Sequence, residues 1–132
     1  MALEPTDAPA PPDGLEVTPH EDYVEVEFTG DFSPGVAMNV VDVMVAACEE
    51  AHRSAILLDC RSMSASPSVI DQFTVAEYGA ENIHRHITVA MLVREDLLLP
   101  DRFFENVAVS RGVRVRQFSD RTQAVDWLEK RA

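Results

Sequence analysis

Ser54-Ala-Ile-Leu-Leu-Asp-Cys60 is a short apolar run that stops at a carboxylate, a pattern typical of a buried parallel strand. Two later runs repeat this pattern, Ile87 to Arg94 and Val113 to Phe118. Each of the three runs leads into a segment whose apolar residues have helical spacing. The chain therefore alternates strand and helix, and we predict an α/β fold with a parallel sheet.

The residues before this run predict a hairpin. Residues 15–17 and 23–28 alternate apolar with acidic side chains, and the turn formers of residues 18–22 separate them. Such alternation indicates antiparallel strands with one face in water. The side chains expected to point into the core are Val24, Val26 and Phe28.

A long helix is predicted from Ser33, a hydroxyl cap followed by Pro34 at the first helical position, to about Arg53. Its core-facing stripe is Val36, Val40, Met44, Ala47 and Ala51. A second apolar flank lies beside that stripe and consists of Met38, Val41 and Val45. This flank either lies under the N-terminal tail or a neighbouring helix, or is a contact patch for another subunit or a partner.

The next helix is expected to follow Pro67 and to reach about Asn82. Its apolar residues at helical spacing are Val69, Phe73, Ala76, Ala80 and Ile83. Two serines compete as its cap, because Ser66 precedes Pro67 while Ser68 and Asp71 have capping-box spacing.

The last third of the chain predicts two more helices and one strand. We interpret residues 95–100 as a loop, and Asp101 or a neighbour as the cap of a helix that Gly112 ends. The final strand covers residues 113–118. Asp120, together with Gln123, is expected to cap a last helix. The apolar residues of these two helices are Phe103, Phe104, Val107, Val109, Ala124, Trp127 and Leu128.

Length and composition predict one domain. The chain has 132 residues, of which 46% are hydrophobic and 26% charged, as in globular proteins. Residues 1–13 are acidic and rich in Pro and Ala, so we expect a disordered tail before a single domain of residues 14–132. No signal peptide is visible and no apolar run is long enough for a bilayer, which indicates a cytoplasmic protein without membrane insertion.

The charge is unevenly distributed. Of the net −12, the whole excess lies in residues 1–60, which hold 13 acids and one base, whereas the remainder holds 10 of each. This imbalance argues against nucleic acid as a partner. It is compatible with a basic partner, with self-association, or with a solvated surface that keeps the protein soluble.

Few residues suggest catalysis. The chain has neither a phosphate-binding loop nor a dinucleotide fingerprint nor a nucleophile elbow, so we expect no enzyme and no cofactor. Cys48 and Cys60 are expected to be buried free thiols. His84 and His86 have no cysteine or third histidine at ligand spacing nearby, so we expect no metal site.

Any site is expected where parallel strands end, because their carboxyl ends share one edge of the sheet. The polar side chains expected there are Asp31, Asp59, Arg61, Arg94, Glu95, Ser119 and Asp120. Of these, Asp59, Arg61 and Arg94 are the candidate ligand-binding residues. The same groups also serve proteins as helix caps and surface ion pairs.

The order of elements, and several segments, resemble a known family. Those segments are Ile56-Leu-Leu-Asp-Cys-Arg61, Ile87-Thr-Val-Ala-Met-Leu-Val93, residues 104–112 and Val115-Arg-Gln-Phe-Ser-Asp-Arg-Thr-Gln-Ala-Val-Asp-Trp-Leu128. Together they resemble the STAS domain of anti-sigma factor antagonists, and more closely its SpoIIAA-like branch. The resemblance implies a (βα) superhelix with a mixed five-stranded sheet, one antiparallel strand and about four helices.

The resemblance also implies a function without catalysis. Antagonists of this kind are switched by phosphorylation of a serine in an Asp-Ser-Ser-Gly motif at the start of the second helix. That motif is absent here, and Ser66 and Ser68 are its approximate counterparts, with capping as their alternative role.

Three hypotheses follow. The first is a non-enzymatic regulatory or protein-interaction module that docks a partner or itself through Met38, Val41 and Val45 and the acidic hairpin. The second is a binder of a small apolar or anionic, lipid-like ligand, by analogy with the fold-related CRAL-TRIO proteins, with Arg61 or Arg94 holding the head group. The third is an acid/base enzyme that uses Asp59.

Overall fold

The strands form one mixed sheet in the order β1-β2-β3-β4-β5, in which β1 runs antiparallel to β2 and all other neighbours are parallel. The computed structural model describes residues 12–64, 67–98 and 102–131. The strands are β1 (Leu15–Pro19), β2 (Val24–Phe28), β3 (Ala55–Asp59), β4 (Thr88–Leu92) and β5 (Arg114–Phe118). The predicted α/β class, the hairpin and the parallel strands are confirmed.

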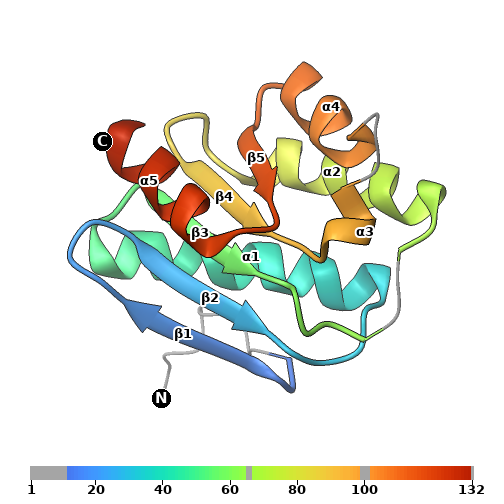
Figure 1. Ribbon diagram of the computed structural model, residues 1–132, viewed down its shortest axis with the longest axis horizontal. Coiled ribbons are helices and arrows are strands. Elements are labelled where there is room, and N and C mark those ends of the chain that lie inside the picture. The colour runs from blue at the N-terminus through green and yellow to red at the C-terminus, as the bar shows by residue number, and fades with distance from the viewer. Residues whose placement is uncertain (1–11, 65–66, 99–101, 132) are drawn as a thin grey trace, which may run out of the picture.

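The helices lie on both faces of this sheet, as Figure 1 shows. They are α1 (Pro34–Ala51), α2 (Val69–Asn82), α3 (Glu95–Leu98), α4 (Phe103–Ser110) and α5 (Arg121–Arg131). In the view of Figure 1, α5 (red) lies in front of β3 and β4, whereas α1 (cyan) lies behind the sheet. The part of the chain described here has no helix that is both long and apolar enough to cross a membrane.

Two apolar cores follow from this arrangement. The larger lies between the sheet and α1, α2 and α4, and it contains the predicted inward residues Val24, Val26 and Phe28. The smaller lies under α5 and is built around Leu57, Leu92 and Leu128. Strands β3 and β4 are thus covered on both faces, which explains why their sequences are almost continuously apolar.

Local sequence signals account for the helix ends. Ser33 accepts a hydrogen bond from the Val36 amide at 3.1 Å and so caps α1, which Pro34 begins. The Thr122 amide donates to the Asp120 carboxylate at 3.3 Å at the start of α5, as predicted. Gly112 has a φ of +95°, so the glycine supplies the backbone conformation that the turn after α4 needs.

The sequence prediction was wrong at the segment before α4. Residues 95–98 form the one-turn helix α3 rather than a loop. Glu95 and Asp96 occupy its first turn, where carboxylates are stabilised by the free amide groups of a helix start. The proposed cap Asp101 and the tail up to residue 11 lie outside the described residues. The first residue before α4 is Arg102, which caps it with no side-chain bond.

Both cysteines are buried free thiols, as the sequence predicted. Burial raises the pKa of Cys48 to about 11 and that of Cys60 to about 12. Both sulfurs are therefore neutral thiols at physiological pH and behave as apolar core atoms.

Candidate functional site

The carboxyl ends of the parallel strands bring Asp59 and Arg61 together. The Asp59 carboxylate accepts hydrogen bonds from the Arg61 amide at 3.1 Å and from its Nε and Nη2 at 3.0 and 2.9 Å. The Asp59 side chain is only 8% exposed, whereas that of Arg61 is 40% exposed. This bidentate pair, which raises the pKa of Arg61, fixes the turn after β3 and gives Asp59 a structural partner.

Arg94 is engaged in the same region. Its Nη1 donates to the Met63 carbonyl at 3.1 Å, and its Nε donates to Asp96 at 3.2 Å. Asp31 forms a short parallel bridge with Ser64, which ties the start of α1 to the segment after β3. Of the predicted polar residues, Asp59 and Arg61 bond to each other, while the bonds of Arg94 and Asp31 go to neighbouring loop residues and position those loops.

The second apolar flank of α1 faces α2. Val41 is buried, and Met38 and Val45 are half-buried. Between them along the helix lies Asp42, whose carboxylate accepts a hydrogen bond of 2.8 Å from the Tyr78 hydroxyl of α2. Val41 and Asp42 thus lie against α2, whereas Met38 and Val45 keep part of their surface exposed, so an interface at Met38, Val41 and Val45 stays a prediction.

The acidic face of the hairpin is partly neutralised within the chain. Glu25 of β2 receives two hydrogen bonds from Arg121, which begins α5. Glu16 and Glu27 are directly opposite each other in the β1–β2 register. Like charges in such a pair repel each other. Of the acidic residues on this face, these two carboxylates are therefore the ones that a nearby cation stabilises most.

Ser68 is the N-cap of α2. Its hydroxyl accepts from the Asp71 amide at 3.1 Å, and the Asp71 carboxylate accepts from the Ser68 amide at 3.2 Å, which completes the predicted capping box. Such a cap contributes about 1 kcal/mol to helix stability. Ser66 lies outside the described residues.

The first two turns of α2 carry an exposed apolar surface. Val69, Ile70 and Phe73 are 61%, 76% and 38% exposed, and we refer to these three residues as the α2 patch. The prediction that Val69 and Phe73 share the core face was wrong for these two turns; of the predicted face, Ala76, Ala80 and Ile83 pack into the larger core. Val69 and Ile70 are adjacent in the sequence, so on a helix their side chains point in different directions. The sequence signal for an exposed apolar side chain was therefore this pair, because both residues cannot face the core.

Polar contacts hold the α2 patch beside α4. The Arg111 guanidinium lies 5.0 Å from the centre of the Phe73 ring, and its Nη2 lies 3.5 Å from the Glu77 carboxylate. Ring and cation attract each other in this geometry. The exposed ring of Phe73 is therefore held in place on the surface.

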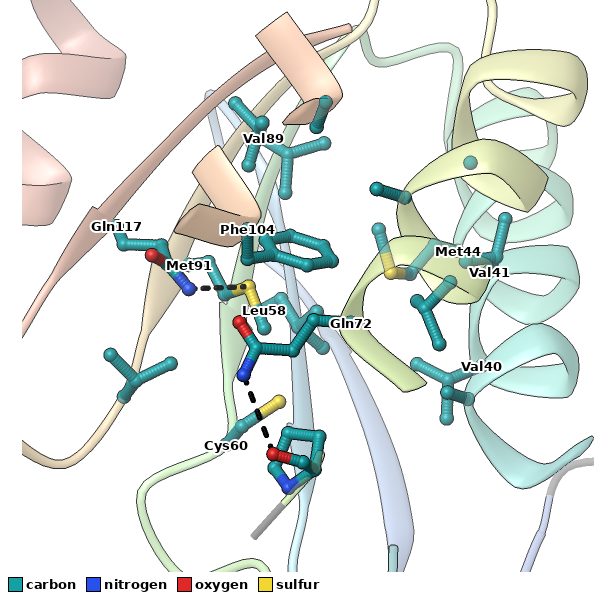
Figure 2. Close-up of a pocket in the computed structure, with 18 of the residues that line it drawn as sticks. Val40, Val41, Met44, Leu58, Cys60, Gln72, Val89, Met91, Phe104 and Gln117 are labelled. Atoms are coloured by element: carbon teal, nitrogen blue, oxygen red, sulfur yellow. Dashed lines mark hydrogen bonds between the residues drawn. The ribbon is translucent and has the colours of Figure 1, made fainter. Parts of the chain in front are cut away.

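A cavity of about 120 Å³ lies between the sheet and helices α1, α2 and α4. Figure 2 shows Phe104 and Met44 on opposite sides of it, with Leu58 and Met91 on the sheet. Gln117 donates to the Met91 sulfur at 3.9 Å, and Gln72 donates to the Pro67 carbonyl at 3.3 Å. The other lining side chains are apolar, among them Phe28, Phe32, Val40, Val41, Cys60, Met63, Ala76 and Val89.

The fold is that of an anti-sigma factor antagonist. The chain is similar to the crystal structure of an anti-sigma factor antagonist from Mycobacterium paratuberculosis, with a TM-score of 0.59 over 87% of this chain and 92% of that chain. The two sequences are 12% identical, so the likeness is one of fold. No protein-family model matches the chain, and no curated protein matches it either. The sequence resemblance thus predicted the architecture correctly.

Proposed function

We propose that this protein is a small non-enzymatic regulatory module of the STAS type, working in the cytoplasm, that binds a protein partner through the α2 patch. The exposure of Val69, Ile70 and Phe73 is the observation that carries the proposal. Apolar side chains that lie together in water mark interaction surfaces. The fold supports the same class, because a solved protein with this fold is an anti-sigma factor antagonist.

The α2 patch has the features of a binding hot spot. A large aromatic ring, held in place by Arg111, gives contact area with little loss of side-chain entropy on binding. Ile70, at 76% exposure, has the most apolar surface left to bury. A complementary partner therefore presents an apolar pocket for Ile70 and Phe73.

A charge at the centre of the α2 patch is expected to weaken partner binding strongly. Ile70→Glu introduces a carboxylate that loses its hydration when the partner binds, so affinity falls tenfold or more, about 1.4 kcal/mol. Wild type and variant are each immobilised in native extract, and the captured proteins are compared by mass spectrometry. Sedimentation of both forms determines whether the partner is a second copy of the chain.

The matched control for this variant is Val17→Ser on β1. Val17 is 39% exposed and lies at the far edge of the sheet, so its replacement removes surface apolar area away from the α2 patch. Proteins that bind wild type and Val17→Ser but not Ile70→Glu fulfil the expectation. If Ile70→Glu captures the same proteins in the same amounts, the α2 patch is not the interface.

A second candidate function is the binding of a small apolar ligand in the cavity beneath α2. An apolar cavity of about 150 Å³ is known to hold benzene, so the cavity of about 120 Å³ admits a group of that size rather than a whole lipid. The Met63 carbonyl, which accepts from Arg94, links one of the predicted head-group residues to a residue that lines the cavity.

Small aromatic compounds provide the test of this second candidate. Titration with benzene or indole is expected to shift the methyl resonances of Met44, Met63 and Met91, which all line the cavity. Met38, which does not line it, is the internal reference. Equal shifts at Met38, or none at the three lining methionines, would exclude a ligand in the cavity.

A further inference from the structure

Three of the four histidines of the chain lie around one depression at the amino ends of β3 and β4, the end of the strands opposite the α2 patch. His52 follows α1, and His84 and His86 precede β4, yet all three line one open depression of about 310 Å³. Strands β3 and β4 are parallel neighbours in which Ala55 is opposite Thr88, so the segments that enter them lie side by side. Arg53 and Ser54 line the same depression.

The side chains of this depression, which we call the histidine pocket, are mostly hydrogen-bond donors. The rings of His84 and His86 are stacked, with centroids 5.4 Å apart and an angle of 16° between their planes. Both rings are exposed and can therefore donate to one ligand. Imidazole, guanidinium and hydroxyl groups all hydrogen-bond to oxygen anions.

Arg53 is incompletely satisfied. Its Nη1 donates to the carbonyls of Ala51 and His52 at 3.3 Å, whereas its buried Nε has no hydrogen-bond partner among the described residues. A buried donor without a partner costs free energy, and an added oxygen acceptor lowers that cost.

Helix ends account for the presence of cations at this place. Both α1 and α2 end at this edge of the sheet, and the free carbonyls of helix ends stabilise positive charge. Those carbonyls explain why basic side chains gather in an otherwise acidic protein.

We propose that the histidine pocket binds a tetrahedral oxyanion, namely a phosphate group, through His52, His84, His86 and Arg53. Several oxygens on one centre can accept from the stacked rings and from the guanidinium together. One carboxylate, that of Glu49, also lines the pocket and opposes the anion. A shared metal ion is not favoured, because the described residues contain no group of three or more His, Cys, Asp or Glu side chains placed to hold one.

Titration of the full chain with inorganic phosphate tests the proposal. The imidazole resonances of His52, His84 and His86 are expected to shift, while those of His20, which is bonded to Glu25 on the hairpin, stay in place. Chloride at the same ionic strength is expected to leave all four unchanged. The double variant H84A/H86A removes two exposed donors and is expected to weaken phosphate binding roughly fivefold. The matched variant H20A keeps wild-type affinity.

The opposite results overturn the proposal. These are shifts of His20 equal to the others, the same shifts in chloride, or unchanged affinity in H84A/H86A. If Zn²⁺ saturates the three imidazoles in the absence of phosphate, the pocket is a metal site, and the proposal of an anion site is likewise rejected. None of these results affects the α2 patch, which lies at the carboxyl ends of the strands, opposite the histidine pocket.

Discussion

Leu57→Ala is expected to lower the free energy of unfolding by about 3 kcal/mol, the largest effect we predict. Leu57 is fully buried in the smaller core, and α5 is the helix that covers that core. Truncation leaves a void between sheet and helix that the two rigid layers fill only in part. Urea unfolding followed by circular dichroism measures the loss, and proteolysis reports whether α5 is released first.

Val109→Ala is the control for this measurement. Val109 is 51% exposed on α4, so its truncation is expected to change stability by no more than about 0.5 kcal/mol. A loss below about 1 kcal/mol for Leu57→Ala would show that α5 does not pack on the sheet as described.

The second large effect concerns Glu25. Arg121 holds its carboxylate with bonds of 2.7 and 2.8 Å, and His20 approaches Oε1 at 2.8 Å. The Arg121 bonds lower the pKa of Glu25 from 4.5 to about 2, against the opposing effect of burial, and His20 contributes further lowering. We expect Glu25→Gln to cost about 2 kcal/mol at neutral pH, less than the full pKa shift implies because Arg121 is 39% exposed.

The pH dependence of this cost has a definite direction. The folded protein binds the Glu25 proton more weakly than the unfolded chain, so the ion pair stabilises the fold fully above about pH 4.5. That contribution is lost as the pH falls from about 4.5 to about 2. Denaturant unfolding of wild type and Glu25→Gln is therefore expected to differ at neutral pH and to converge near pH 2.

Glu27→Gln is the matched control, because Glu27 lies on the same strand and the same face of the sheet. It faces Glu16 in the register, so its neutralisation is expected to cause little loss or a slight gain. A difference between Glu25→Gln and wild type that persists unchanged down to pH 2 would contradict the proposed origin in the Glu25 ion pair.

The sequence was sufficient to predict an element where only one local structure is compatible with a short pattern. The apolar runs that end at Asp59 and near Arg94 became central parallel strands, because only strands covered on both faces tolerate such continuous apolarity. The capping pair Ser68 and Asp71 was also predictable, since its bonds join residues three positions apart.

The candidate sites were predictable only in part. The edge where Asp59, Arg61 and Arg94 lie followed from strand direction alone, but their pairing with each other and with loops did not. The α2 patch differed from the prediction because helical spacing gives the relative direction of side chains and not the distance at which the helix lies from the sheet.

The sequence by itself determined the order of strands and helices, most of their ends and the inward faces of the hairpin, because propensity, capping and apolar periodicity act between near neighbours. Only the tertiary structure decided which distant groups meet. Arg121 reaches Glu25 across 96 positions, and His52 joins His84 and His86 across about thirty. Such contacts depend on how α5 and the parallel strands are placed in space, and no local pattern in the chain encodes that placement.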